Sequence, residues 1–151
     1  MKVLFALLVL SSVVPGSACR AAEPVQAALK YFVQVVRGTD DKIPPETGAK
    51  LIGAKLQKQL QPMFRWPHYW EVQQKPVTVE EGKTAKTDLK SGHVMEIDLR
   101  EQGKRTVRLF RGGKVVRTQV CSRGQEFMIQ GTEPGDGKVW FFVVRTDPPS
   151  I

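Results

Sequence analysis

The sequence has few of the residues that build metal sites and disulfides. It contains two cysteines, Cys19 and Cys121, and two histidines, His68 and His93. A zinc site needs more Cys and His ligands than this, and a disulfide framework needs more paired cysteines. The segment TEPGDG at residues 132–137 lacks the alternating acids and the terminal Glu of a calcium loop. We therefore expect no metal site and no cofactor.

The sequence also lacks the motifs that mark common catalytic sites. It has no P-loop, no dinucleotide fingerprint and no glycine-flanked nucleophile. Pairing of Cys121 with a histidine would give a nucleophile and a base. Nothing around Cys121 supports that role, because it ends an apolar stretch where a free cysteine usually acts as a small buried hydrophobe. We expect no catalytic residue and no enzyme activity.

No hydrophobic run is long enough to cross a membrane. Val3–Val14 has 12 residues, whereas a membrane-spanning helix needs about 20. Lys2 precedes this run and small residues follow it, which is the layout of a secretory signal peptide. Signal peptidase could cut after Ala18 or after Ala21. An uncleaved N-terminal anchor is the alternative.

The targeting segment predicts where the protein works. We assign residues 1–21 to the signal peptide and residues 22–151 to a single domain that is secreted or periplasmic. Lipidation of Cys19 would instead anchor the protein to the envelope. Small residues precede Cys19 as in a lipoprotein signal, but Gly16 stands where a Leu-like residue is usual.

The chain is basic, with 23 Lys and Arg against 15 Asp and Glu, a net charge of +8. Removal of residues 1–21 takes away Lys2 and Arg20 and leaves 21 basic against 15 acidic residues, a net charge of +6. A basic exported protein can meet anionic lipid, polysaccharide or nucleic acid at the envelope. Net charge alone does not choose among these ligands.

The first half of the chain predicts one strand and one helix. Leu29–Gly38 is rich in Tyr, Phe and Val, which favours a strand, with a short helix from Pro24 as the alternative. Glu46–Gln61 carries apolar residues at steps of three and four, which is typical of an amphipathic helix. Pro62 would end it.

The second half predicts a series of strands separated by turn residues. His93–Glu101 alternates apolar and polar side chains as a half-buried strand does. Lys138–Arg145 is continuously apolar and predicts a central strand buried on both faces. The fold class is therefore α+β: an N-terminal strand, one amphipathic helix, then a mostly antiparallel β-sheet or meander. The other expected strands are 68–74, 77–82, 105–111, 114–121 and 126–130.

Short turns predict how these strands pair. A two-residue turn at Gly112-Gly113 would place Arg108 opposite Arg117. The preceding turn would place Asp98 opposite Arg108. One sheet face would then gather Arg100, Arg108 and Arg117 around Asp98 as a candidate anion-binding site. The basic side chains assigned to this face are Arg100, Arg105, Arg108, Arg111, Lys114, Arg117 and Arg123.

An aromatic cluster follows the predicted helix. Phe64, Trp66, Tyr69 and Trp70 fall within the stretch MFRWPHYWEV. They could form a stacking platform for a sugar or a base, or they could fill the core where the helix meets the sheet. We favour core, because Tyr69 and Trp70 alternate along a strand and cannot share one platform. For the same reason one of these two should be partly exposed.

Several segments, in order, resemble a family of small secreted bacterial proteins of uncharacterised function. These segments are GTDD, the helix, MFRWPHYWEV, VRLFRGGKVV and VWFFVV. The resemblance implies an exported protein with a strand, a helix and then a sheet. It implies no activity and transfers no catalytic residue.

We expect a non-enzymatic domain that acts as an interaction or structural module of the envelope, with another envelope protein or an anionic surface polymer as its partner. The alternative is a binder of anionic glycan, lipid or nucleic acid through the basic sheet face. Few aromatics lie between the arginines, so the pattern typical of single-stranded nucleic-acid binding is poor. We expect no specific nucleic acid as a partner. The two hypotheses differ in salt response, since polyanion binding weakens steeply as salt rises.

Overall fold

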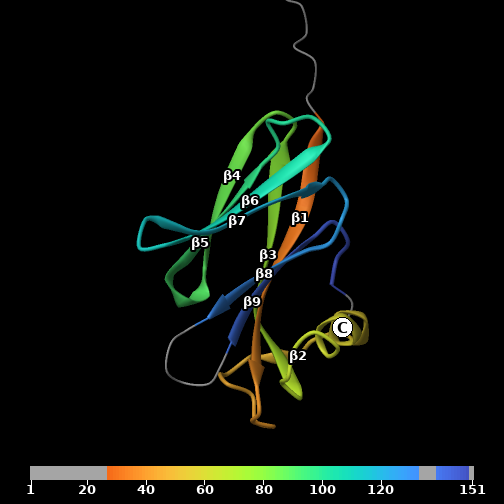
Figure 1. Ribbon diagram of the computed structural model, residues 1–151, viewed down its shortest axis with the longest axis vertical. Helices are drawn as coiled ribbons and strands as arrows, with labels where there is room; N and C mark the ends of the chain where they lie inside the picture. Colours follow the sequence, from red (N-terminus) through yellow and green to blue (C-terminus); the bar gives the residue numbers. More distant parts are fainter. Residues whose placement is uncertain (1–26, 133–138, 150–151) are drawn as a thin grey trace, which may run out of the picture.

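The computed structural model describes residues 27–132 and 139–149, which form antiparallel strands and one short α-helix (Figure 1). The strands make two sheets, one with the order β2-β3-β1-β9-β8 and one with the order β4-β5-β6-β7. The elements in chain order are β1 (Ala28–Thr39), β2 (Lys50–Leu51), α1 (Ala54–Leu60), β3 (His68–Glu80), β4 (Thr84–Leu89), the 3-10 turn η1 (Lys90–Gly92), β5 (His93–Asp98), β6 (Lys104–Arg111), β7 (Lys114–Ser122), β8 (Phe127–Thr132) and β9 (Val139–Arg145).

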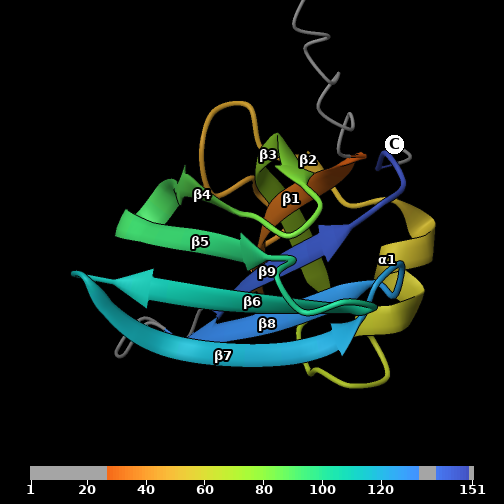
Figure 2. The same cartoon turned by 90° about the horizontal axis from the view of Figure 1, so that it is seen from above.

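The two sheets lie in layers, with α1 against the far face of the five-stranded sheet (Figure 2). Between the sheets, Tyr31 and Val33 of β1 pack in one cluster with Met95 and Ile97 of β5. On the far face, α1 buries Leu56 and Leu60 in a second cluster, which includes Val36, Phe141 and Val143. The five-stranded sheet is therefore covered on both faces.

The last strand confirms the interpretation of the C-terminal apolar run. β9 lies between β1 and β8, and all of its residues are buried. Alternate residues supply the two clusters, because successive side chains of a strand point to opposite faces. A continuous apolar sequence is the pattern of such a doubly covered strand.

The strand expected over Leu29–Gly38 lies within β1, but the helix differs from the expectation of Glu46–Gln61. α1 covers only Ala54–Leu60, and Lys50–Leu51 instead form β2 against β3. Gly48 takes a φ of 85°, which a right-handed helix does not allow. Gly53 is extended at the N-cap, with φ −62° and ψ 152°, so the helix begins at Ala54, although the apolar steps of the longer pattern still face the core.

One strand was predicted as two, and another was not predicted. The sequence predicts separate strands over residues 68–74 and 77–82, but β3 is continuous from His68 to Glu80 and includes Pro76. Pro76 is exposed and pairs with β1, and β2 stops short of it. A proline is tolerated on such an uncovered strand edge, where its missing N–H is not needed. β4 was missed because its exposed residues are short polar and charged side chains.

The predicted pairing of β5 with β6 is wrong by two residues. Asp98 lies opposite Thr106 instead of Arg108, and Arg108 lies opposite Glu96. The turn between these strands is longer than expected, because β5 ends at Asp98 and β6 begins at Lys104. A shift of two residues leaves every side chain on its predicted face.

The predicted pairing of β6 with β7 holds only at the turn. Gly112 and Gly113 have φ angles of 56° and 75°, as a two-residue hairpin turn requires. A bulge then inserts Val116, so that Leu109 faces Arg117 and Arg108 faces Thr118. Because directly opposite residues share a face, the inserted residue moves Arg117 away from Arg108, contrary to the prediction.

Within the two ranges that the structure describes, no helix has the length and apolarity to cross a membrane. The predicted signal peptide over residues 1–21 and its Cys19 lie outside these ranges.

Candidate interaction surface

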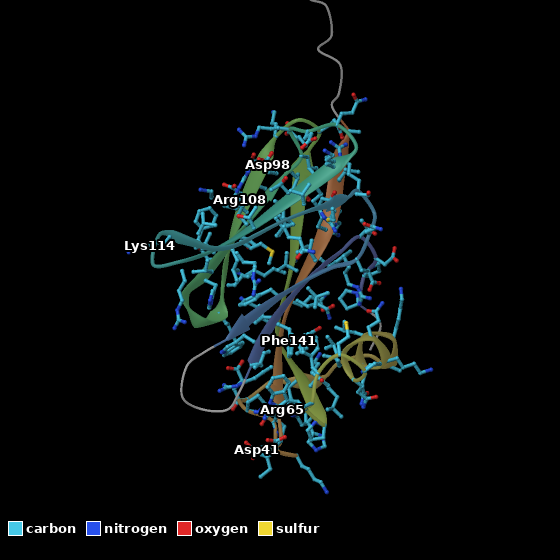
Figure 3. The ribbon with its side chains drawn as sticks, in the orientation of Figure 1. Asp41, Arg65, Asp98, Arg108, Lys114 and Phe141 are labelled. Carbon is cyan, nitrogen blue, oxygen red and sulfur yellow. The ribbon has the colours of Figure 1, made fainter. Side chains whose placement is uncertain are left out.

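The four-stranded sheet turns one face toward the five-stranded sheet and the opposite face, here called the outer face, away from it. Strand pairing sets its side chains in three rows from β4 to β7. Its central row contains Arg108, which lies close to Asp98 (Figure 3). The three rows are Lys86, Glu96, Arg108 and Thr118; then Thr84, Asp98, Thr106 and Val120; then Asp88, Val94, Phe110 and Val115.

The charges at the centre of the outer face pair with one another. Arg108 Nη1 donates to Glu96 Oε1 at 2.6 Å and to Asp98 Oδ2 at 3.1 Å. Arg100 donates from Nε to Asp98 Oδ1 at 3.0 Å and from Nη2 to Asp98 Oδ2 at 2.6 Å. Lys86 Nζ lies 3.3 Å from Glu96 Oε2. The five side chains form a chain of alternating sign.

This network keeps Asp98 ionised. The hydrogen bond from the Arg100 side chain, helped by the Arg100 backbone N–H and by Arg108, holds the pKa of Asp98 well below its usual range although the carboxyl is buried. The same residues border an open depression of about 440 Å³, which Glu101 and Thr106 also line. Its wall therefore presents arginines that already have carboxylate partners.

The structure brings together two of the three predicted anion-binding residues. Arg100 and Arg108 meet at Asp98 as expected. Arg117 does not join them, because its partner Leu109 is a core residue of the opposite face. Arg117 is exposed and makes no ion pair with the residues that the structure describes.

Two other predicted members of the basic face are engaged elsewhere. Arg105 is completely buried between the sheets, where Nη2 donates to the Gln125 carbonyl and lies 3.3 Å from Cys121 Sγ. Its guanidinium is 5.1 Å from the centre of the Tyr31 ring. Arg123 donates to the carbonyls of Leu99, Glu101 and Lys104 and pairs with Glu81. Both arginines serve the fold.

β7 is almost wholly exposed to solvent. It is an edge strand, and every residue is exposed except Cys121, which is half-buried. Val115, Val116 and Val120 keep 52%, 51% and 53% of their surface open to solvent. Figure 2 shows β7 at the outer margin of the molecule, with β6 beside it. Exposed β-branched side chains on a strand edge are typical of a surface that accepts another strand.

The backbone of β7 also presents free hydrogen-bonding groups. The Arg123 N–H donates to the Gly103 carbonyl at 3.2 Å, which continues the β6–β7 pairing beyond Ser122. In an antiparallel pair, alternate residues direct their N–H and C=O groups to the partner strand. By this alternation, Gln119 and Cys121 bond to β6, whereas Thr118 and Val120 direct their backbone groups to the open edge.

The aromatic cluster is core, as predicted. Trp66 and Tyr69 are buried against Phe141, with ring centres 5.9 Å from it in both cases, and Phe64 packs at 4.7 Å. Figure 3 shows Phe141 in the lower half of the molecule, toward α1. Trp70 lies opposite Arg37 on the other face of the sheet. A shared stacking platform is therefore absent from these residues.

The expectation that Tyr69 or Trp70 would be partly exposed is wrong. Tyr69 is 1% exposed and Trp70 is 8% exposed. Alternation along β3 does place them on opposite faces, but both faces are covered at this level of the sheet. The Tyr69 hydroxyl donates to the Phe64 carbonyl at 3.3 Å, which satisfies its polar group in the core.

Cys121 does not meet a histidine. Its thiol contacts Arg105, and His93 pairs with Arg111 at the other end of β6. Six residues of strand separate these two positions on β6, which corresponds to about 20 Å. Cys121 packs partly against the core between the sheets, in keeping with its interpretation as a small hydrophobe.

Sequence reasoning missed a polar chain beside α1. Buried Arg145 donates to Glu126 Oε1 at 2.9 Å and to Gln34 Oε1 at 3.4 Å, and Gln34 donates to Glu71. Lys55 of α1 donates to Glu126 at 2.9 Å. Burial alone would raise the pKa of Glu126, but the hydrogen bonds from Arg145 and Lys55 outweigh it and lower that pKa to about 2. Arg145 ends an apolar run, which gave no signal of a buried ion pair.

Among the residues that the structure describes, no group of His, Cys, Asp and Glu side chains is arranged to hold a metal ion. Comparison of the chain with protein-family models, with curated proteins and with solved structures finds no match. The resemblance to small secreted bacterial proteins therefore stays a prediction, and the outer face and the β7 edge are the surfaces on which a function can be argued.

Proposed function

We propose that this protein is a non-enzymatic interaction module of the cell envelope that binds an extended polypeptide segment by strand addition at β7. The proposal rests on one observation: β7 combines an open strand edge with the half-exposed side chains of Val115, Val116 and Val120. The export of the protein, on which its access to the envelope rests, is argued from the N-terminal targeting segment.

Strand addition uses what β7 presents. An added strand would hydrogen-bond to the outward backbone groups of Thr118 and Val120, and the exposed valines would supply apolar contact. Main-chain bonds give affinity in this mode, and the side-chain contacts give specificity. Phe110 is half-buried in the outer-face row that contains Val115, so apolar contact would extend from the edge onto that face.

The charge arrangement favours a polypeptide partner over a polyanion. Arg100 and Arg108 are held by Asp98 and Glu96, so a phosphate or sulfate would have to compete with carboxylates that already bind these arginines. Such a competition weakens anion binding, because the arginines gain little by exchanging one anionic partner for another.

Binding of anionic glycan, lipid or nucleic acid is the second candidate. It is favoured by the basic balance of the chain and by exposed Lys114 and Arg117 on β7. In that case retention on immobilised heparin would fall steeply as salt rises, whereas strand addition would be far less sensitive. Measuring binding over a series of salt concentrations therefore distinguishes the two candidate functions.

Site-specific photo-crosslinking in the natural host tests the proposal. A photoreactive residue at Val120 is compared with one at Thr84, which lies in the same cross-strand row on the opposite edge strand β4. We expect polypeptide adducts at position 120 and few at position 84, and we expect Thr118→Pro to abolish them because it removes an outward N–H. Equal adducts at both positions, or adducts that Thr118→Pro leaves unchanged, would overturn the proposal.

A further inference from the structure

The open edge of β7 lacks the protection that the edge strands β2 and β4 have. Natural edge strands are kept from pairing by short length, by charged side chains or by bulges. β2 has two residues, and β4 carries Lys86 and Asp88 among its exposed side chains. β7 has a bulge and Arg117 in its first half, but the stretch Thr118–Ser122 has no charge and no irregular pairing.

We infer that this stretch pairs with the same stretch of a second copy of the chain, an inference that rests on the proposed strand addition and names its partner. Two copies of one strand can meet only in an antiparallel arrangement about a two-fold axis, with residue i opposite j and j opposite i. Across the open edge, residues that direct their N–H and C=O groups outward, such as Thr118 and Val120, must lie opposite other outward-directed residues in order to bond. The two-fold axis must therefore pass through a residue and not between two residues.

Charge and the regular length of β7 together select one register. An axis at Thr118 would set the bulged Val116 opposite Val120. An axis at Cys121 would pair Gln119 with Arg123, beyond the end of β7. An axis at Arg117 would set two arginines opposite each other, and an axis at Val120 would set Arg117 opposite Arg123. Like charges directly opposite are unfavourable. An axis at Gln119 sets Gln119 against itself and Thr118 against Val120, with no like charges opposed in the uncharged stretch. Thr118 and Val120 are β-branched, which suits cross-strand packing.

This register predicts a short Cα–Cα distance between the two copies at position 119. Gln119 bonds to β6, so across the open edge it would form a non-hydrogen-bonded pair with its symmetry mate. Such pairs bring their Cα atoms to about 4.5 Å, within the range that a disulfide spans. The contact would join two four-stranded sheets into one continuous sheet. The contact between the two copies involves few residues, so we expect a weak dimer whose fraction rises with concentration.

Engineered cysteines in the purified, exported full chain test this pairing. In a Cys121→Ser background, Gln119→Cys is compared with Arg117→Cys, an exposed position two residues away on the same face of β7. We expect Gln119→Cys to form an oxidised dimer at least about ten times faster than Arg117→Cys, because only position 119 meets its own mate. Sedimentation velocity of the unmodified chain should show a dimer that grows with concentration and is lost in Thr118→Pro.

Two results would overturn the inference: a monomer at every concentration, or equal dimer formation by both cysteine variants. These results are separable from a failure of the proposed function. If the chain is monomeric but Val120 adducts to a different polypeptide still disappear in Thr118→Pro, the edge takes a foreign strand and only the second copy is excluded. If Thr118→Pro changes neither dimer formation nor adducts, both proposals fail.

Discussion

At the scale of single residues, buried and half-buried charges hold the ends of the two sheets in place. Arg123 shows this most clearly, because its Nη2 donates to the Leu99 carbonyl at 3.0 Å and to the Glu101 carbonyl at 3.3 Å, while Nη1 pairs with Glu81. One guanidinium thus joins the turn before β6 to the turn before β4. Arginine suits this role because its donors spread in a fixed planar fork.

Arg123→Ala should therefore destabilise the protein by about 1–3 kcal/mol, since it leaves several carbonyls and Glu81 without their donor. The matched control is Arg117→Ala, which removes an exposed arginine of the neighbouring strand and should change stability by less than about 0.5 kcal/mol. Urea unfolding of both variants measures the difference. Equal stability losses would show that Arg123 does not fasten the turns.

Glu126 should make stability depend on pH. Its folded-state pKa of about 2 lies below the ordinary value of 4.5. The ionised carboxylate is therefore preferred in the folded state, so its contribution is fully present above about pH 4.5 and is lost as the pH falls toward 2. Glu126→Gln should cost about 1–3 kcal/mol at pH 7 and much less at pH 2.5, as measured by urea unfolding. A loss that stays constant across this range would contradict the assigned ion pair with Arg145.

At the scale of the elements, the bulge and the open edge of β7 decide which surface is available. Val116 inserts one residue into the pairing, which separates Arg117 from Arg108 and breaks up the predicted three-arginine site. Beyond the bulge, pairing with β6 becomes regular again and leaves alternate backbone groups of β7 without a described partner strand.

Proline scanning tests that alternation. Thr118→Pro removes an N–H that points to the open edge and should cost no more than about 1 kcal/mol. Gln119→Pro removes an N–H that bonds to β6 and should cost about 3 kcal/mol or more. Thermal unfolding of the two variants compares them directly. The opposite order would mean that Thr118 faces β6 and that the open edge presents other residues.

Gly38 shows how closely β1 approaches the aromatic core. A Cβ at this position would lie 3.0 Å from Phe141 Cε2 and 3.3 Å from the Trp66 ring. Gly38→Ala should therefore destabilise the fold by about 1–3 kcal/mol through overpacking, whereas Thr78→Ala on exposed β3 surface should have little effect. Chemical unfolding provides the measurement. A neutral Gly38→Ala would show that the two rings yield without cost.

Strand patterns could be predicted from the sequence wherever one face or both faces are apolar. β5, β6 and β9 carry clear signals, and the hairpin turn at Gly112-Gly113 could be identified from its glycines. β4 could not, because its residues carry little apolar alternation. The bulge in β7 could not either, since Val116 looks like any other strand residue. Single insertions are set by packing, which local sequence does not record.

At the scale of the whole molecule, the two sheets have different roles. The five-stranded sheet is covered on both sides and supplies stability, whereas the outer face and the β7 edge remain for contact. The candidate site could be predicted only in part, because Arg100 and Arg108 meet while Arg117 lies across the sheet. The ion pairs of Arg123 with Glu81 and of Arg145 with Glu126 could not be predicted from their spacing in the sequence.

The central claim is that contact with a partner runs along β7, and amide hydrogen exchange resolved by residue tests it most directly. The purified chain is compared alone at low concentration and after addition of the solubilised envelope fraction of its host. We predict that the Thr118 and Val120 amides exchange quickly in the dilute chain and become protected on addition, while β4 is unchanged. Protection confined to other strands, or protected Thr118 and Val120 amides in the dilute monomer, would contradict the account.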